Sequence, residues 1–580
     1  MRGHEVKTLP TNLRTRARVA TAAALLVLLT ACGGGKENDS GESAAALPPA
    51  EQPTAEAAAR FLTQSTFGPN QDSIDWVRVH GQAAWVRIQL AAPQNRHLNY
   101  VNAVAASFAG TDSTIQQSHF RESFWTQALT APDQLRQRAA FALSQIFVVS
   151  FADSNVSGQI RGVTTYYDML GEKAFGNYRD LLEAVTLHPV MGQYLTMRGN
   201  QKEDAKGRVP DENYAREIMQ LFSIGLYELN DDGTYKGGTP TETYTHEDIQ
   251  GLAKVFTGWS WYAGPNAADR TNSRFGGGNA NPDRDWMPMQ AYANYHSVSE
   301  KKFLGVTIPA NTKADAEAEL KIALDTLFNH PNVGPFIGKL LIQRLVTSNP
   351  SPAYVGRVAA AFNNNGQGVR GDMKAVFTAV LLDPEARSYN SLSNSTGKVR
   401  EPVLRLSNLL RATQATSVKG NYTGIDDTDN TVTRLSQTVL RSPTVFNFFR
   451  PGYTPPGSDL AKAGFVSPEL QLTNEVSVAG YLNYIRGWIS ASTTRDVQPN
   501  WAPFVALAED VPALVDRVNL LLMSGQMPDA LRTQIVAAVE GRTIRKATAT
   551  NANDVANDKT DRVRIAFMLA MASPDYLIQK

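Results

Sequence analysis

The stretch DENYAREIMQLF, residues 211–222, carries two side-chain patterns that both repeat every three or four residues. The polar pattern comprises Asn213, Arg216, Glu217 and Gln220. The apolar pattern comprises Tyr214, Ile218, Leu221 and Phe222. Residues at this spacing share one side of an α-helix. The stretch is therefore predicted to be a helix whose apolar side packs against a core while its polar side contacts other polar groups.

The same periodicity extends over most of the chain after residue 54. Two further examples are Leu135, Ala139, Ala142, Leu143 and Ile146, and Leu320, Ala323, Leu324 and Leu327. The exceptions are a small β-hairpin over residues 226–235, with Asp232-Gly233 at its turn, and a long irregular loop over residues 261–302. The predicted fold is mainly α: a multi-helical globular body with one small β-hairpin and one long irregular loop.

The N-terminal segment has the features of a bacterial secretion signal. Three arginines between residues 14 and 18 precede a run rich in Ala, Leu and Val over residues 19–31. This run is too short for an ordinary membrane span, which needs about 20 residues. Leu29-Thr30-Ala31-Cys32 then resembles a lipobox, which implies cleavage before Cys32 and lipid attachment to its thiol. A buried or reactive free cysteine is the alternative.

These features predict a protein that is anchored to the cell envelope by lipid. Residues 1–31 are the expected lipoprotein signal peptide, residues 32–53 a flexible tether rich in Gly, Ser, Ala and Pro, and residues 54–580 the folded body. Gly33 follows the lipidated cysteine, at the place where an Asp would resemble an inner-membrane retention signal. The outer membrane is therefore the favoured location.

The composition excludes several classes of function. The formal net charge is +1, and because residues 1–31 carry five basic side chains and one acidic side chain, the chain from residue 32 onward has a net charge of −3. This balance does not favour nucleic-acid binding. Cys32 is the only cysteine, so the folded body has no disulfide, thiolate metal site or cysteine nucleophile. The Gly-x-Ser-x-Gly and P-loop motifs are also absent, which argues against a serine hydrolase elbow and a P-loop ATPase.

Several blocks, in order along the chain, resemble the bacterial family known as domain of unknown function 1800 (DUF1800). They are ARFLTQSTFGP at 59–69, FW at 124–125, QLRQR at 134–138, ALSQ at 142–145, DENYARE at 211–217 with GL at 225–226, FTGW at 256–259, FFRPGY at 448–453 and SPDY at 573–576. The resemblance implies a secreted or envelope-attached, largely helical bacterial protein and no particular activity. Members often have His-Asp where this chain has His296-Ser297, which argues against a metal role at that position.

A second polar stripe is predicted on a helix that begins at Ser467 and carries Gln471, Asn474 and Glu475. If the two stripes meet, Glu217 and Glu475 form a carboxylate pair, which supports acid–base catalysis or holds a hard cation. The alternative is a buried hydrogen-bond network neutralised by Arg216 or Arg450, because an unpaired buried carboxylate is costly. The candidate polar site is thus Asn213, Arg216, Glu217, Gln220, Asn474 and Glu475. Glu217 is predicted to be enclosed beside an arginine, with Glu475 or Asn474 nearby.

Five further residues are weaker candidates: Asp211, His188, His246, His296 and Arg450. His188 precedes Pro189 at a predicted helix end, where a protonated imidazole would interact favourably with the helix dipole. His246 is expected at the first position of a helix capped by Thr245 with Asp248. No His-Glu-x-x-His pair or other zinc-ligand spacing is present, so the sequence identifies no metal.

Two acidic runs, residues 231–233 and 426–430, are candidates for calcium, with a hairpin turn and a solvated loop as the alternatives. Aromatic residues between Trp259 and Tyr295 could stack on sugar rings, with core packing as the alternative. The favoured hypothesis is an envelope lipoprotein that binds or assembles an extracellular polymer such as a polysaccharide, or that partners another exported protein. The alternative is a carboxylate-dependent hydrolase of an envelope polymer, so the sequence leaves open whether the protein is an enzyme.

Overall fold

The computed structural model describes residues 48, 51–265, 275, 281–388, 396–420, 422–425, 427–490 and 495–580. The chain divides into two units, residues 1–45 and residues 46–580, and all described residues belong to the second unit. Cys32, the signal peptide, most of the tether, Asp426 and part of the 261–302 loop lie outside the described residues. The predictions made for them are therefore not addressed by the structure.

The described unit is mainly α-helical, as the periodicity predicts. Its first half contains α1 (Ala55–Ser65), α2 (Gln71–His80), α3 (Gln82–Ala91), α4 (His97–Ser107), α5 (Gln117–Thr130), α6 (Gln134–Ser144), α7 (Ile160–Lys173), α8 (Tyr178–Leu187), α9 (Pro189–Tyr194), α10 (Asn213–Gln220) and α11 (His246–Val255). Its second half contains α13 (Ala316–Asn329), α14 (Val333–Leu345), α15 (Pro352–Asn363), α16 (Met373–Leu382), α17 (Pro384–Arg387), α18 (Pro402–Ala412), α19 (Asp459–Lys462), α20 (Glu475–Ile489), α21 (Ala502–Val505), α22 (Val511–Met523), α23 (Asp529–Glu540), α24 (Ala552–Ala572) and α25 (Pro574–Leu577). Short 3-10 helices cover Lys236–Gly238, Ala293–Tyr295 and Pro468–Leu472.

The strands are short and form two-stranded antiparallel sheets. They are β1 (Trp259–Ser260) with β2 (Gln290–Ala291), β3 (Lys301–Phe303) with β4 (Val306–Ile308), β5 (Lys398–Val399) with β8 (Ile578–Gln579), and β6 (Thr416–Ser417) with β7 (Val497–Gln498). The predicted hairpin over residues 226–235 is reduced to a single bridge between Leu229 and Tyr235. The hairpin among the described residues is β3–β4 and not residues 226–235, and the reason is that strands of two or three residues leave too short an alternating pattern to locate from sequence.

The α10 segment confirms most of the predicted apolar side. Tyr214, Ile218 and Phe222 are fully buried. The helix ends at Gln220, so Leu221 is its C-cap and is only partly buried. The helix predicted to begin at Ser467 was wrong: a 3-10 turn ends at Leu472, and α20 begins after Asn474, whose side chain accepts from the Ser477 N–H in a capping box. Gln471 and Glu475 therefore belong to two separate helical segments and do not share one helix face.

Two helices, α6 and α18, form the centre of the hydrophobic core. Every residue of α18 is buried, including its three basic and amide side chains, Arg405, Asn408 and Arg411, which a surface helix would turn toward water. Arg411 illustrates how such a side chain is accommodated, because its guanidinium donates to the backbone oxygens of Gly68, Ala128 and Leu129. The last two belong to the final turn of α5, whose carbonyls have no partner within that helix. Buried polar side chains of α18 thus satisfy the ends of neighbouring helices.

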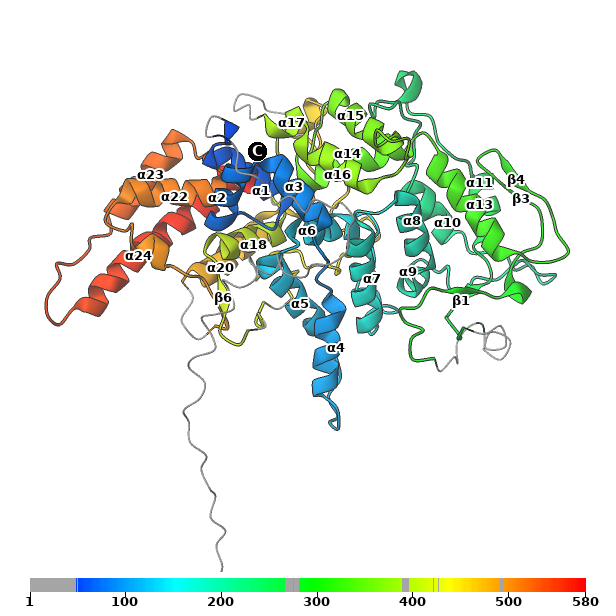
Figure 1. The fold of residues 1–580 in the computed structure, drawn as a ribbon, viewed down its shortest axis with the longest axis horizontal. Coiled ribbons are helices and arrows are strands. Elements are labelled where there is room, and N and C mark those ends of the chain that lie inside the picture. Colours follow the sequence, from blue (N-terminus) through cyan, green and yellow to red (C-terminus); the bar gives the residue numbers. More distant parts are fainter. Residues whose placement is uncertain are drawn as a thin grey trace, which may run out of the picture. The chain divides into compact units, whose positions relative to one another are not determined.

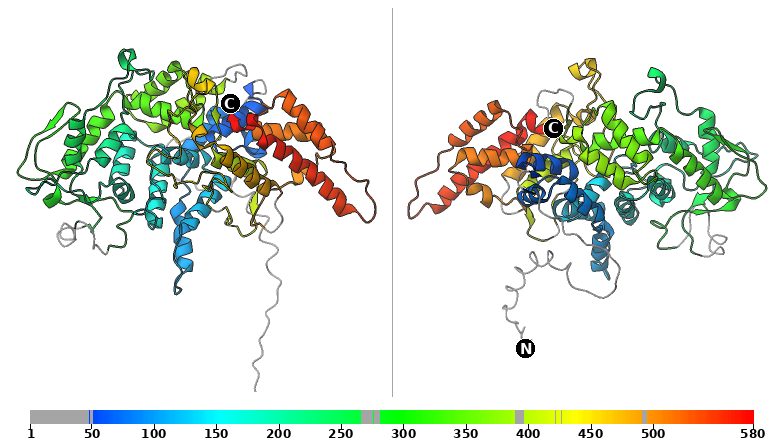
Figure 2. Two further views of the ribbon diagram at one scale, coloured as in Figure 1. Left: turned by 180° about the vertical axis from the view of Figure 1, so that it is seen from behind. Right: turned by 45° about the horizontal axis from the view of Figure 1, so that its top comes forward.

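The helices α22, α23 and α24 lie at one end of this unit, while α11, α13 and the β3–β4 hairpin lie at the other (Figure 1). Figure 2 shows the same separation from two further sides. Near the middle, β8 pairs with β5, so the C-terminal strand closes onto the segment that leads into α18. In the described part of the chain, every helix falls short of the length or the hydropathy that crossing a bilayer requires.

Candidate functional site

A groove of two lobes runs along one side of α14. The larger lobe has a volume of about 1180 Å³ and the smaller one about 620 Å³, and both are open to solvent on one side. The lobes share Leu226, Tyr227, Phe336, Leu340, Pro451 and Gly452. We call this feature the α14 groove.

The spacing of side chains along α14 explains how one helix serves both the core and the groove. Val333, Ile337, Leu341 and Leu345 repeat every four residues and are fully buried. Phe336, Lys339, Leu340, Gln343 and Arg344 lie on the other side and line the groove. Lys339 and Gln343 belong to the larger lobe, whereas Arg344 belongs to the smaller one. The helix therefore separates two differently lined compartments.

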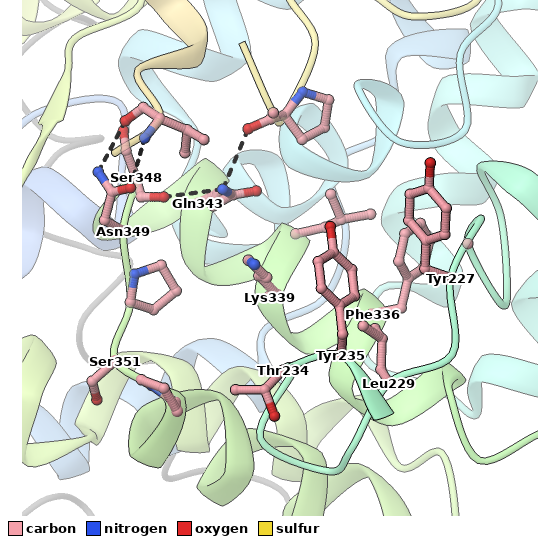
Figure 3. A pocket seen from close by; sticks show the side chains of 18 of the residues that line it. Tyr227, Leu229, Thr234, Tyr235, Phe336, Lys339, Gln343, Ser348, Asn349 and Ser351 are labelled. Atoms are coloured by element: carbon pink, nitrogen blue, oxygen red, sulfur yellow. Dashed lines mark hydrogen bonds between the residues drawn. The ribbon is translucent and has the colours of Figure 1, made fainter. Parts of the chain in front are cut away.

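In the larger lobe, Lys339 lies between a wall formed by residues 349–351 and two tyrosines (Figure 3). Tyr227 and Tyr235 contact each other edge to face, with ring centroids 5.6 Å apart. Both rings are substantially exposed, at 38% and 44%. Gln343 Nε2 donates to the Ser348 backbone oxygen at 3.0 Å, which holds the amide at the base of this lobe.

The loop that carries the tyrosines is fixed to the start of α14 by one buried amide. Asn332 Nδ2 donates to the backbone oxygens of Ile224 and Tyr227, at 2.9 and 2.7 Å, and Asn332 Oδ1 accepts from Leu229 N at 3.0 Å. Gly225 has a φ of +71°, and a Cβ there would lie 2.8 Å from the Phe336 ring. Glycine is required at this position both for the backbone angle and for the close approach of the ring.

The smaller lobe brings together segments that are far apart in sequence. Gln145 at the end of α6, Gln220 at the end of α10, and Arg344 all line it, together with residues 445–446 and 450–454. Arg344 stacks over the Phe449 ring at 4.7 Å, and Arg450 stacks over Phe446 at 5.0 Å. The backbone N–H of Arg450 donates to Gln471 Oε1 at 2.9 Å, which connects this wall to the 3-10 turn after Ser467.

A buried charge network lies behind the smaller lobe. Lys398 Nζ lies 3.0 Å from Glu469 Oε1 and 3.7 Å from Glu401 Oε1, and it donates to the Arg344 backbone oxygen. Gln145 and Gln437 both donate to Glu401 Oε2, at 2.6 and 2.8 Å. Arg138 donates to the same Arg344 oxygen at 2.8 Å. Gln145 thus belongs both to the network and to the groove wall.

The ionisation of this network follows from burial and from three neighbouring cations. Burial by itself raises the pKa of Glu401, but Lys398, Arg138 and Arg344 lower it overall, so this carboxylate is charged. Burial raises the pKa of Glu469, and the charge of Lys398 only partly opposes this. The network of Arg138, Arg344, Lys398, Glu401 and Glu469 has three basic and two acidic groups. The wall behind the smaller lobe therefore has an excess of positive charge.

Comparison with known protein families identifies the family of the chain. The family model described as a protein of unknown function, DUF1800, matches residues 60–578. The chain belongs to the DUF1800 family. No curated protein and no solved structure matches it. The blocks quoted above that end in Gln145, Gly225-Leu226 and Tyr453 all contribute residues to the α14 groove of this DUF1800 protein.

The structure separates the residues predicted to form one polar site. Gln220 and Arg450 line the groove. Arg216 pairs with Glu212 at 3.3 Å instead of with Glu217. Glu475 is exposed, Asn474 caps its own helix, and α20 packs against α24, on the other side of the unit from α10 (Figure 1). The predicted meeting of the Glu217 and Glu475 stripes was therefore wrong. Asn213 remains at the start of α10, where its N–H donates to Asp211 Oδ1.

Glu217 is enclosed, as predicted, but without a charged partner at ion-pair distance. The residue is 7% exposed, and its Oε2 atom is buried with no hydrogen-bond partner among the described residues. Burial raises the pKa of Glu217, and the charge of Arg216 opposes this only in part. The arginine-neutralised network predicted from sequence is thus absent here, because Arg216 turns to Glu212 one turn earlier.

Glu217→Gln should therefore raise the free energy of unfolding at pH 8, by about 1 kcal/mol, because it removes a carboxylate that has no charged partner. A raised pKa means that wild-type stability falls as the pH rises above the usual Glu value, and the variant should not show this fall. Denaturant unfolding at pH 5 and pH 8 measures both effects. Glu212→Gln is the matched control and should change stability by less than about 1 kcal/mol. A clear loss of stability in Glu217→Gln would reveal a charged partner.

Of the three candidate histidines, two are buried and make hydrogen bonds within the fold, and one is exposed. His188 ends α8, as predicted, and caps α9 through its Nδ1 atom, and burial lowers the pKa of its imidazole to about 3, so it is neutral and makes no charge–dipole interaction. His246 is exposed at the first position of α11, as predicted from its capping box with Thr245 and Asp248. His296 is fully buried, with Nδ1 2.7 Å from the Thr257 oxygen and Nε2 2.8 Å from Glu319.

The acidic residues proposed for calcium are engaged by protein groups. Asp232 accepts from both the N–H and the hydroxyl of Thr234, which defines a turn. Asp427 pairs with Arg121 at 2.9 Å, and Asp429 pairs with Arg441 at 3.0 Å. Among the described residues, His, Cys, Asp and Glu side chains nowhere gather in threes that could hold a metal ion.

Most of the groove residues were not singled out by the sequence. Gln145, Gln220 and Arg450 were quoted or predicted, but Lys339, Arg344 and the paired tyrosines were not. The available signal was the alternation of buried and groove-facing side chains along α14, which by itself is typical of any surface helix. Of the aromatic residues between Trp259 and Tyr295, Trp259, Trp261 and Tyr292 are buried, whereas Tyr295 is 37% exposed and lies outside the groove lining.

Proposed function

We propose that this DUF1800 protein is a lipid-anchored envelope protein that binds an extracellular polysaccharide in the α14 groove. The observation that carries the proposal is the lining of the groove, which combines six aromatic rings, two of them exposed and four half-buried, with five amide side chains. The aromatic rings are Tyr227, Tyr235, Phe336, Phe446, Tyr453 and Phe465. The amides are Gln145, Gln220, Asn230, Gln343 and Asn349.

This lining suits the chemistry of sugars. A pyranose ring has a face of C–H groups, which an aromatic ring can cover with a large and rigid apolar surface. Its rim carries hydroxyls, and an amide can both donate to and accept from such groups. Two lobes that are open on one side accommodate a chain that continues beyond the groove, which favours a polymer over a small enclosed ligand.

The lining supports binding more than hydrolysis by a carboxylate pair. Glu385 is the one carboxylate among the described residues that line the two lobes. Its oxygens accept from the backbone N–H and the hydroxyl of Ser351. Glycoside hydrolases of the usual type place two carboxyl groups across the scissile bond. Glu217 is buried but lies outside the groove lining, so it does not supply the second group.

Tyr227→Ala and Tyr235→Ala should each weaken polysaccharide binding about tenfold, the scale expected when a central aromatic contact is removed. Because both rings are exposed, the stability of the fold should change little. Affinity electrophoresis of the purified full chain against a panel of neutral and acidic polysaccharides measures the effect. Ile88→Ala, at a residue 41% exposed on α3, is the matched control. Equal binding by all three variants and the wild type would exclude the groove as the site.

A further inference from the structure

We propose that the polysaccharide taken by the α14 groove is acidic, with carboxylate or sulfate groups recognised by Lys339, Arg344 and Arg450. This inference rests on the proposed function, since it names the chemical class of the same ligand. The inference does not come from the overall charge of the protein, because the chain from residue 32 onward has a net negative charge. It comes from the local charge of the groove.

Lys339 provides the cation of the larger lobe. Its ammonium group makes no ion pair or hydrogen bond with another described residue, although the side chain lies in the concave part of the molecule (Figure 3). Partial desolvation by the groove lowers the pKa of this ammonium, while the residue as a whole stays exposed. An anionic group on a ligand would restore the interaction that the ammonium lacks.

Arg344 provides the cation of the smaller lobe. The residue is 3% exposed, and its guanidinium has no hydrogen bond or ion pair with another described residue. Most buried arginines elsewhere in the described chain do find acceptors, as Arg411 does with three backbone oxygens. Arg344 instead stacks on Phe449, and its charge interacts with Glu401 and Glu469 beyond ion-pair distance, so its hydrogen-bond donors are unused by the described residues. A planar guanidinium in this position is suited to a carboxylate or sulfate, which can accept two parallel hydrogen bonds.

Arg450 adds a third cation at the rim of the smaller lobe. Its side chain is exposed, stacks over Phe446, and has no ion pair with a described carboxylate. The opposing charge among the lining residues is Glu385, which lies in the larger lobe and is held by Ser351. The described groove lining therefore has three cationic side chains and one anionic side chain.

The placement of these cations predicts a repeating ligand. Lys339 and Arg344 are five residues apart on α14, which corresponds to about 7.5 Å along the helix axis. They line different lobes, so successive sugars of one chain are suited to contact them separately. A polymer with an anionic group on each repeat engages both, and the second contact is then intramolecular. Acidic oligomers should therefore bind more tightly as they lengthen from one lobe to two.

Matched polysaccharide pairs test the charge requirement. Polygalacturonate and its fully methyl-esterified form share a backbone and differ in charge, as do dextran sulfate and dextran. We expect the full chain to bind at least one acidic member about tenfold or more tightly than its neutral partner. Raising the salt from about 0.05 to 0.5 M should weaken binding of the acidic member, because the exposed cations Lys339 and Arg450 are screened.

Variants assign the effect to the groove. Lys339→Met and Arg450→Gln should each weaken binding of the acidic member about five- to tenfold and weaken binding of the neutral member by a smaller factor. Both side chains are exposed and unpaired with described carboxylates, so the fold should tolerate the changes. Lys374→Met on α16 and Arg87→Gln on α3 remove exposed charges outside the groove and are the matched controls. Arg344 is left intact because the charge network behind it depends on its position.

The outcomes separate this inference from the proposed function. Equal binding of the acidic and neutral members, or no effect of either groove variant, would overturn the inference and leave polysaccharide binding in place. Failure of all four polymers to bind would overturn both. Binding of polyglutamate but of none of the polysaccharides would also overturn both and would identify an acidic protein as the ligand.

Discussion

Lys398→Met should lower the free energy of unfolding by about 3 to 5 kcal/mol, because it removes the cation shared by two fully buried carboxylates. Lys398 is inaccessible to solvent, and its ammonium lies 3.0 Å from Glu469 and 3.7 Å from Glu401. Methionine fills nearly the same volume, so the expected loss is electrostatic and does not come from a cavity. Urea unfolding at pH 7.5, followed by circular dichroism, measures the change.

Two further variants make this prediction specific. Adding Glu469→Gln to Lys398→Met should recover a large part of the loss, since one uncompensated charge then disappears and Glu401 retains its amide donors. Lys462→Met is the matched control, because Lys462 also pairs with a carboxylate, Asp459 at 2.8 Å, but on the exposed surface. Its loss should be below about 1 kcal/mol. A loss of similar size in the two lysine variants would refute the network as a source of stability.

His188→Asn should remove a loss of stability that the wild type suffers in acid, amounting to about 3 kcal/mol at pH 4.5. Burial lowers the pKa of His188 to about 3 in the folded state, whereas the unfolded imidazole has its usual value of 6.5. Above pH 6.5 both states are neutral and the residue costs nothing. As the pH falls from 6.5 toward 3, only the unfolded state gains the proton, so the folded state loses stability. Burial lowers the pKa of His97 to about 4, which adds a second loss of the same sign.

The measurement compares denaturant unfolding of the two proteins at pH 7.5, 6, 5 and 4.5. Asparagine keeps an acceptor for the Val190 N–H that His188 caps, and it is a favoured N-cap residue. Thr165→Val is the control, because Thr165 contacts the same imidazole and its replacement leaves the proton-binding group in place. The free energy of unfolding of the wild type and of Thr165→Val should fall equally as the pH decreases below 6.5. That of His188→Asn should fall less. Parallel curves for all three proteins would show that His188 does not resist protonation.

Local sequence patterns predicted much of the secondary structure and little of the site. The helix over residues 211–222 and the helix capped by Thr245 were recognised because periodicity and capping depend on residues within one or two turns. The helix placed at Ser467 failed because Asn474 and Ser477 form a stronger cap seven residues later. The carboxylate pair failed for a different reason, since the spacing within each stripe holds no information about which stripes meet.

The sequence by itself determined the family, the mainly helical class and the apolar side of α10, because each depends on short-range order that a core requires. Only the tertiary structure decided where polar groups go. It turned Arg216 toward Glu212, left Glu217 without a charged partner, and brought Gln145, Gln220 and Arg344 into one lobe. The lobe depends on contacts between segments far apart in the chain, and the choice of Glu212 over Glu217 by Arg216 depends on how the packing around α10 leaves each carboxylate placed.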